Sequence, residues 1–290
     1  MRRSIDHLVL CVRDLDAACN FYRSLGFTLT PRARHPWGTE NSLVQLRGNF
    51  LELLAIGDAS GITPPAPGHF SFGAFCRDFL AQREGMAMLV FASENASADR
   101  AEFMARGLKT YAPFDFSRRA KLPDGSEATV AFSLAFATDP RMPDVAFFTC
   151  QQHAPQYFWK PEYQRHANGA RRVVEVVMAA SDPASLADFF ARLVEPSALK
   201  QGEGRLAVAL EGGTLLILDK ARLAERFPGL SLAGFPAASA FMGYSIEVDD
   251  LDRLSALLQR NGAAFTRGPG RLRIEPAQAF GIAVEFQTES

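Results

Sequence analysis

SIDHLVLCVRDLD, residues 4–16, contains the pattern from which the rest of the chain is built. Its first half alternates, with Ile5, His7 and Val9 on one side of an extended chain, and a period of two is typical of a β-strand. Asp14 follows where a helix would begin, and apolar residues then recur at helical spacing. The stretch therefore predicts a strand, a tight turn and an amphipathic helix, with a single histidine on the strand.

The same order of elements recurs three more times along the chain. An acidic residue stands at or near the start of each predicted helix, where a carboxylate can accept backbone N–H bonds: Asp14, Glu94, Asp182 and Asp250. Four copies in a fixed order predict an internally duplicated chain of four β-α-β-β-β modules. A length of 290 residues suits two domains at the usual size of roughly 150 residues each.

Composition excludes several classes of protein. The chain is 48% hydrophobic with 24 Phe, which is enough apolar residues for hydrophobic cores. Its formal net charge is −1, and no basic patch in the sequence indicates nucleic-acid binding. Apolar runs are far shorter than the roughly 20 residues that span a bilayer. Residues 1–3 lead straight into the first predicted strand, so we expect no signal peptide. The four cysteines form no CxxC pair, so we expect reduced thiols and a cytoplasmic protein.

Three short pieces resemble the glyoxalase-like domain family of the vicinal oxygen chelate superfamily, which includes glyoxalase I, extradiol dioxygenases and bleomycin-resistance proteins. They are DHLVL at 6–10, HPWGT at 35–39 and CQQH at 150–153. The close resemblance covers about residues 4–170, and the rest shares only the module pattern. It implies an α+β fold of two tandem domains with cupped mixed sheets: residues 1–168, which hold the site, and residues 169–290, a degenerate second copy.

In that superfamily the first and last strands of each module line a cup and offer up to four metal ligands. His7 and Glu52 match the ligand positions of the first module, and the resemblance makes His153 the third predicted metal ligand. The second module places Ala87 and Phe147 at the corresponding positions. In the second domain these positions are expected at Glu175, Ile217, Gly243 and Glu285, a set that would not hold an ion tightly.

Glu52 lies in an otherwise apolar strand, and a buried carboxylate needs a partner. That partner is an arginine in one reading, and a metal ion or the substrate in the other. Glu52 and His35 are the predicted catalytic residues, as base or ligand and as proton shuttle. Trp37, on the same loop as His35, is predicted to wall the substrate pocket, although a packing corner is an equal interpretation.

Two further residues are predicted to bind substrate. Arg118 could clamp a carboxylate with two hydrogen bonds, with a solvated turn as the alternative interpretation. Gln151 belongs to the CQQH piece and is predicted to bind substrate beside His153.

The leading hypothesis is an enzyme that uses a divalent metal ion, Zn²⁺, Mn²⁺, Fe²⁺ or Ni²⁺, to act on a small oxygen-bearing organic molecule. Lyase or isomerase chemistry and dioxygenation both remain open, because a fold does not fix a reaction. The alternative is a metal-free protein that binds and sequesters a small molecule, and a scaffold role is a third reading. The expected partner is the small-molecule substrate, with no nucleic acid and no membrane, and a homodimer is possible.

Overall fold

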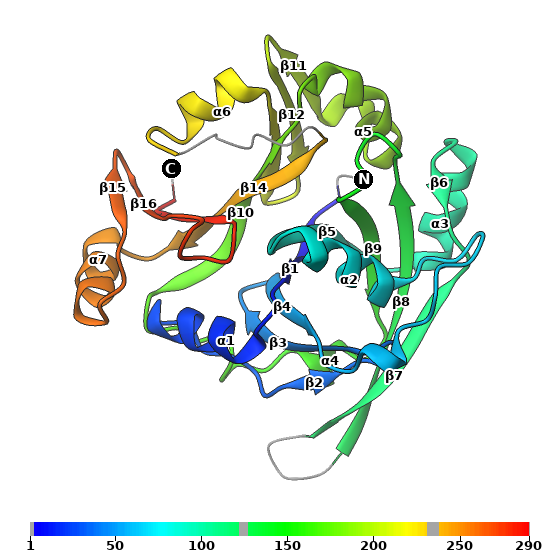
Figure 1. The fold of residues 1–290 in the computed structure, drawn as a ribbon, viewed down its shortest axis with the longest axis horizontal. Coiled ribbons are helices and arrows are strands. Elements are labelled where there is room, and N and C mark those ends of the chain that lie inside the picture. Colours follow the sequence, from blue (N-terminus) through cyan, green and yellow to red (C-terminus); the bar gives the residue numbers. More distant parts are fainter. Residues whose placement is uncertain (1–2, 122–126, 231–237, 290) are drawn as a thin grey trace.

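The computed structural model describes residues 3–121, 127–230 and 238–289, which form two mixed β-sheets (Figure 1). The first sheet consists of β1 (Ile5–Cys11), β2 (Ala33–Arg34), β3 (Thr39–Gln45), β4 (Phe50–Ile56), β5 (Gly85–Ser93), β6 (Lys109–Thr110), β7 (Phe114–Lys121), β8 (Glu127–Thr138) and β9 (Ala146–Gln152). The second consists of β10 (Ala170–Ala179), β11 (Leu199–Gly202), β12 (Arg205–Leu210), β13 (Gly213–Leu218), β14 (Ala240–Val248), β15 (Thr266–Gly268), β16 (Arg271–Ile274) and β17 (Ala283–Gln287).

Short helices connect these strands. The α-helices are α1 (Leu15–Ser24), α2 (Phe72–Gln82), α3 (Ala96–Ala105), α4 (Pro155–Phe158), α5 (Ala187–Leu193), α6 (Lys220–Arg226) and α7 (Leu251–Arg260). Single 3₁₀ turns are η1 (Ala59–Gly61), η2 (Pro183–Leu186) and η3 (Pro196–Ala198).

Each sheet joins two modules through the same pairings. The first strands of neighbouring modules pair antiparallel, β1 with β5 and β10 with β14, and each first strand also pairs parallel with the last strand of its module. The predicted α+β class and the tandem, four-module arrangement are confirmed. The strands of the first sheet end at Gln152 and those of the second begin at Ala170, while the division into domains at residue 168 stays a prediction.

The helix of the second module, α3, is capped one residue later than the sequence pattern predicts. Asn95, and not Glu94, is the N-cap of α3, and its side chain accepts a hydrogen bond from the Ala98 amide. A shift of one residue moves a strand position to the opposite face of a sheet. Counted from the N-caps, the position that corresponds to His7 is therefore Met88. Val90 pairs with Phe148 as Val9 pairs with Glu52, so Phe148 corresponds to Glu52. These two positions replace the predicted Ala87 and Phe147.

A similar correction applies to the third module. β10 pairs with β13 so that Val177 lies opposite Leu216, as Val9 lies opposite Glu52 in the first module. The position that corresponds to Glu52 is therefore Leu216, while Ile217 packs on the other face of the sheet.

The two sheets share a hydrophobic core, so neither half packs alone. Leu8 and Leu10 of β1 and Val176 and Met178 of β10 belong to one buried cluster, which also includes apolar residues of α1, α5 and α7. Within this core the hydroxyl oxygens of Tyr22 on α1 and Tyr244 on β14 are 2.6 Å apart. The opposite face of the first sheet carries a separate cluster, and this face holds the candidate site.

The residues after the predicted aromatic run form a strand and not a solvated turn. β7 contains Phe114, Phe116 and Arg118 and pairs antiparallel with β8. The two strands form a long hairpin that projects from the first sheet (Figure 1). Because alternate residues of a strand share a face, Phe114, Phe116 and Arg118 lie on one side of β7.

Candidate functional site

A narrow cavity opens on the face of the first sheet opposite the shared core. Its free space is about 50 Å³, enough for an ion with a few water molecules or for part of a small ligand. Both modules of the first sheet, the loop before β3 and the helices α2 and α4 contribute to its walls. The lining residues are His7, His35, Trp37, Asn41, Leu43, Phe50, Glu52, Phe72, Phe116, Arg118, Phe132, Leu134, Phe148, Cys150 and Phe158.

β1 and β4 place His7 and Glu52 on the same face because the two strands pair in parallel. Val9 lies opposite Glu52 in this pairing, and His7 lies opposite Phe50. The His7 ring stacks on the Phe50 ring, with the centroids 4.3 Å apart. Both His7 and Glu52 are buried, so the two polar side chains must find partners within the protein.

His35 reaches the cavity from the loop before β3, through a tight turn. The His35 amide donates a hydrogen bond to the carbonyl of Thr39, and the Gly38 amide donates to the carbonyl of His35. Gly38 has a φ of +82°, and a Cβ atom there would lie 2.3 Å from the Asp58 carbonyl oxygen. Only glycine fits this position, so Gly38 fixes where the loop places His35.

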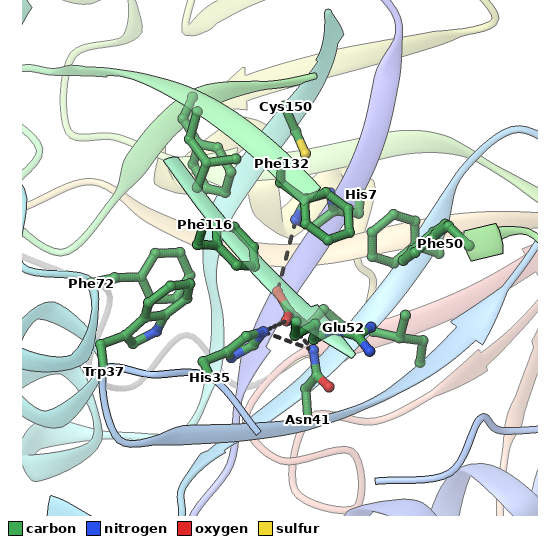
Figure 2. Close-up of a pocket in the computed structure, with 15 residues that line it drawn as sticks. His7, His35, Trp37, Asn41, Phe50, Glu52, Phe72, Phe116, Phe132 and Cys150 are labelled. Carbon is green, nitrogen blue, oxygen red and sulfur yellow. Dashed lines mark hydrogen bonds and ion pairs between the residues drawn. The ribbon is translucent and has the colours of Figure 1, made fainter. Parts of the chain in front are cut away.

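Glu52 is the centre of the polar cluster (Figure 2). Its Oε1 accepts a hydrogen bond from Asn41 Nδ2 at 2.5 Å and lies 3.7 Å from His35 Nε2. Its Oε2 lies 3.8 Å from His7 Nε2. Two imidazoles thus present Nε2 to the two oxygens of one carboxylate.

The other nitrogen of each imidazole is held from outside the cluster. His7 Nδ1 lies 2.6 Å from Asp6 Oδ2, and Gln152 Nε2 donates to the other oxygen of Asp6. His35 Nδ1 lies 2.8 Å from Thr39 Oγ1. These outer contacts orient both rings and leave the Nε2 atoms directed at Glu52, an arrangement typical of histidines that ligate metals.

Burial lowers the pKa of two cavity residues. It lowers the pKa of His35 to about 4, against a smaller opposing effect of the Glu52 carboxylate, so the imidazole is neutral at pH 7. Burial also lowers the pKa of Arg118, and Glu52 partly offsets that effect. No hydrogen-bond partner of the Arg118 guanidinium lies among the described residues. Arg118 is therefore a cation available to an anionic ligand.

Aromatic rings form most of the remaining wall. Trp37 is buried and stacks on His35 with the centroids 4.7 Å apart, and Phe116 packs edge-on against both rings. Phe148, at the position that corresponds to Glu52, packs edge-on against His7. Trp37 Nε1 is buried and has no hydrogen-bond partner among the described residues. The cavity is thus polar at its centre and apolar elsewhere.

The structure brings together five of the seven predicted site residues: His7, His35, Trp37, Glu52 and Arg118. The other two lie outside the cavity. Gln151 faces α3, where its Oε1 accepts a hydrogen bond from the Ala96 amide. His153 lies beyond the end of β9, is exposed, and contacts Ser133.

Sequence reasoning missed Asn41 and Asp6, which hold Glu52 and His7. Asp6 precedes the histidine directly, and its burial signals a partner, since buried carboxylates are paired. Asn41 could have been found from the alternation of β3, because Asn41 and Leu43 face the cavity together.

The corresponding face of the second sheet holds an ion-paired network of arginines and carboxylates. Arg226 Nη2 lies 2.5 Å from a carboxylate oxygen of both Glu175 and Glu285. Arg271 pairs with the same two carboxylates, and Ser245 donates to them. These two arginines neutralise the carboxylates that the sequence places at ligand positions, so the set does not present free anionic ligands.

The donor atoms of the first site are of the kinds that bind a divalent ion, although they are not already arranged as a set of metal ligands. Neutral imidazole and carboxylate suit Zn²⁺, Mn²⁺, Fe²⁺ and Ni²⁺, and two histidines with one carboxylate are the ligands of many non-haem iron centres. Across the part of the chain that the structure describes, no three or more His, Cys, Asp or Glu side chains are already grouped as metal ligands. The fit therefore rests on His7, His35 and Glu52 as a donor set.

Two sheets, each built from a pair of β-α-β-β-β modules, with a candidate site on the first and last strands of one module, define a protein of the vicinal oxygen chelate superfamily. Within it, the model of the glyoxalase-like domain family matches residues 5–194, about two thirds of the sequence. The chain belongs to this family. The match continues past residue 168 and ends just after α5.

Solved structures share the fold at low sequence identity. A hypothetical protein from Staphylococcus aureus superimposes with a TM-score of 0.70 at 11% identity, over 99% of this chain and 100% of that one. A mutant of 4-hydroxymandelate synthase from Streptomyces coelicolor gives 0.60 at 13%, over 100% and 94%. A fusion of a xylose isomerase-like TIM barrel with 4-hydroxyphenylpyruvate dioxygenase gives 0.59 at 13%, over 100% of this chain and 49% of that one.

Two findings complete the comparison. No curated protein matches the sequence. In residues 3–121, 127–230 and 238–289, no helix combines the length and the apolar character needed to cross a membrane.

Proposed function

We propose that the protein is a metal-dependent enzyme that acts on a small oxygen-bearing organic molecule in the cavity of the first sheet. One observation carries the proposal: the Nε2 atoms of His7 and His35 both face the Glu52 carboxylate, and each Nδ1 atom has an outer partner. A histidine that serves only packing or a single hydrogen bond does not need its Nε2 atom to face a carboxylate that a second histidine also faces. His7, His35 and Glu52 would hold the ion.

Each side chain has a part in this site. Asp6 accepts the Nδ1 proton of His7 and keeps Nε2 unprotonated towards the cavity. Asn41 holds one oxygen of Glu52. When bound, a divalent ion supplies Lewis-acid stabilisation of negative charge on substrate oxygens. Glu52 is also the carboxylate placed to take a proton from the substrate, as a general base.

The remaining residues bind and shield the substrate. Arg118 is the cation available to a carboxylate or to another anionic oxygen of the substrate. The rings of Trp37, Phe116 and Phe148 form walls that exclude water. Exclusion of water strengthens electrostatic interactions within the site. Isomerase or lyase chemistry and dioxygenation are both compatible with these parts.

A metal-free binding protein is the second candidate, and a specific observation favours it. The second module has Met88 and Phe148 at the positions that correspond to His7 and Glu52. An apolar, aromatic wall could bind an uncharged ring without an ion. In that case Glu52 would accept hydrogen bonds only from the ligand or from Asn41, and would not bind a metal ion.

Metal content separates the two candidates. The purified protein is loaded with Zn²⁺, Mn²⁺, Fe²⁺ or Ni²⁺ in turn and freed of excess, and bound metal is measured by elemental analysis. We expect one ion per chain for at least one metal, and loss of that ion in His7→Ala and Glu52→Gln. His153→Ala is the matched control, because His153 lies outside the cavity, and it should retain the ion. Wild type without bound metal, or equal binding in all variants, would favour the binding protein.

A further inference from the structure

A basic groove lies next to the cavity. Its open volume is about 410 Å³, large enough for a phosphate-sized group with part of its carrier. Basic side chains from three segments line it: Arg32, Arg34, Arg118, Arg119 and Lys160. No Asp or Glu is among the residues that line it. The whole chain, by contrast, has 31 basic and 32 acidic residues, so positive charge is concentrated here.

The groove and the cavity are continuous. Asn41, Leu43, Arg118 and Phe158 line both of them. Arg118, on β7, therefore stands at the passage from the polar centre around Glu52 to the basic groove. A ligand longer than the cavity would extend past Arg118 and into the groove.

Two of the basic groups are available to a ligand. Arg32 is paired with Asp16 at 2.6 Å and Glu40 at 3.0 Å. Arg118 and the Lys160 ammonium, in contrast, have no hydrogen-bond or ion-pair partner among the described residues. Half-buried cations without a counter-ion are costly, and an anionic ligand would remove that cost.

The protein itself fixes where the Lys160 segment lies. Gln45 on β3 accepts a hydrogen bond from the Lys160 amide at 3.0 Å and donates one to the Phe158 carbonyl at 2.8 Å. The side chain is thus anchored at its backbone while its ammonium stays free. Tyr157, at 41% one of the most exposed large hydrophobic side chains, borders the same groove.

We propose that the groove is a subsite for the anionic end of the ligand, a phosphate or carboxylate group, whose oxygen-bearing head occupies the cavity. The substrate class is then a small molecule with two parts, joined past Arg118. This inference deepens the proposed function and rests on it only for the position of the head. Lys160 and Arg118 are the residues that select the charged end.

Phenyl phosphate and phenol are matched probes for the subsite, since they share a ring and differ in the charged group. Their dissociation constants are measured by calorimetry on wild type, Lys160→Gln and Lys200→Gln. Lys200, exposed on β11, is the matched control. We expect wild type to bind phenyl phosphate at least about tenfold more tightly than phenol, which corresponds to roughly 1.4 kcal/mol. Lys160→Gln should lose most of this preference, and Lys200→Gln should keep it.

Phenylacetate in the same titrations tells which anion is favoured. A tighter fit of phenyl phosphate assigns a phosphate end, and a tighter fit of phenylacetate assigns a carboxylate end. Equal affinity of wild type for all three probes, no binding of either anion, or the same constants in Lys160→Gln and Lys200→Gln would each overturn the subsite.

Glu52→Gln separates this inference from the proposed function. The variant should lose the metal ion and still prefer phenyl phosphate to phenol. If wild type binds no metal but Lys160→Gln abolishes the preference, the subsite stands and the metal-dependent enzyme fails. If metal binding is as expected but the preference is absent, the proposed function stands and the subsite fails.

Discussion

The polar side chains of the cavity surround the Glu52 carboxylate, and both histidines among them have a second partner outside the cluster. Asn41 donates to one oxygen, His7 and His35 face the carboxylate, and Asp6 orients His7. His7 and Glu52 could be predicted from the sequence because the family resemblance indicates the strands that carry ligands and strand alternation fixes the face of each residue. The third donor, His35, was predicted to belong to the site but not to join the metal ligands. Its position depends on a loop that tertiary contacts shape.

At this scale, Asp6→Asn tests the outer contact of His7. An amide can donate to Nδ1 and so favours the tautomer that protonates Nε2, the nitrogen that would bind the ion. We expect metal affinity to fall about 10–100-fold, the usual effect of losing such a partner. Competition with a chelator of known affinity measures it. Asp16→Asn, on the exposed side of α1, is the control, and an unchanged affinity in Asp6→Asn would contradict the role of Asp6.

Among the elements, the loop before β3 shows why part of the site escapes sequence analysis. A strand has a period of two, so an error of one residue reverses the face assigned to a side chain. Placing the cap at Glu94 and not at Asn95 shifted the predicted counterpart of His7 from Met88 to Ala87. The loop has no period at all. Its course depends on the close approach of Gly38 to the carbonyl of Asp58, which no local pattern reveals.

Gly38→Ala tests this loop, with Gly48→Ala in the β3–β4 turn as the matched control. Both glycines have positive φ, +82° and +83°, so each alanine costs roughly 1–2 kcal/mol of backbone strain. Only at Gly38 does the new Cβ also meet a backbone atom, at 2.3 Å. We expect Gly38→Ala to lower the free energy of unfolding more than Gly48→Ala, and to weaken metal binding while Gly48→Ala does not. Chemical denaturation and metal titration report the two effects, and equal losses in both variants would count against the steric argument.

The molecule as a whole is two sheets on one shared core. Tandem modules could be predicted because the order of elements repeats four times, and the repeat survives small errors in boundaries. The shared core could not be predicted, because it depends on contacts such as that of Tyr22 with Tyr244, which are 222 residues apart in sequence. The second sheet supports the first through this core, while arginines occupy its own ligand face.

The tyrosine pair tests the sharing of the core. Tyr244→Phe leaves the buried Tyr22 hydroxyl unpaired, and we expect a loss of about 1–3 kcal/mol in the free energy of unfolding. The double variant Tyr22→Phe/Tyr244→Phe should be less destabilised than the sum of the single variants, because it leaves no orphaned hydroxyl. Urea denaturation of all four proteins gives the coupling. Strict additivity would show that the two hydroxyls do not interact across the core.

The proposed function requires that His7, His35 and Glu52 together bind one metal ion. Cobalt(II), which reports its own ligands by visible absorption, tests it most directly in titrations of wild type, His35→Ala and His153→Ala. We expect a sharp end point at one ion per chain for wild type and for His153→Ala, and loss of that end point and its spectrum in His35→Ala. A wild type whose spectrum stays that of cobalt(II) in water, or a His35→Ala variant that titrates like wild type, would contradict it.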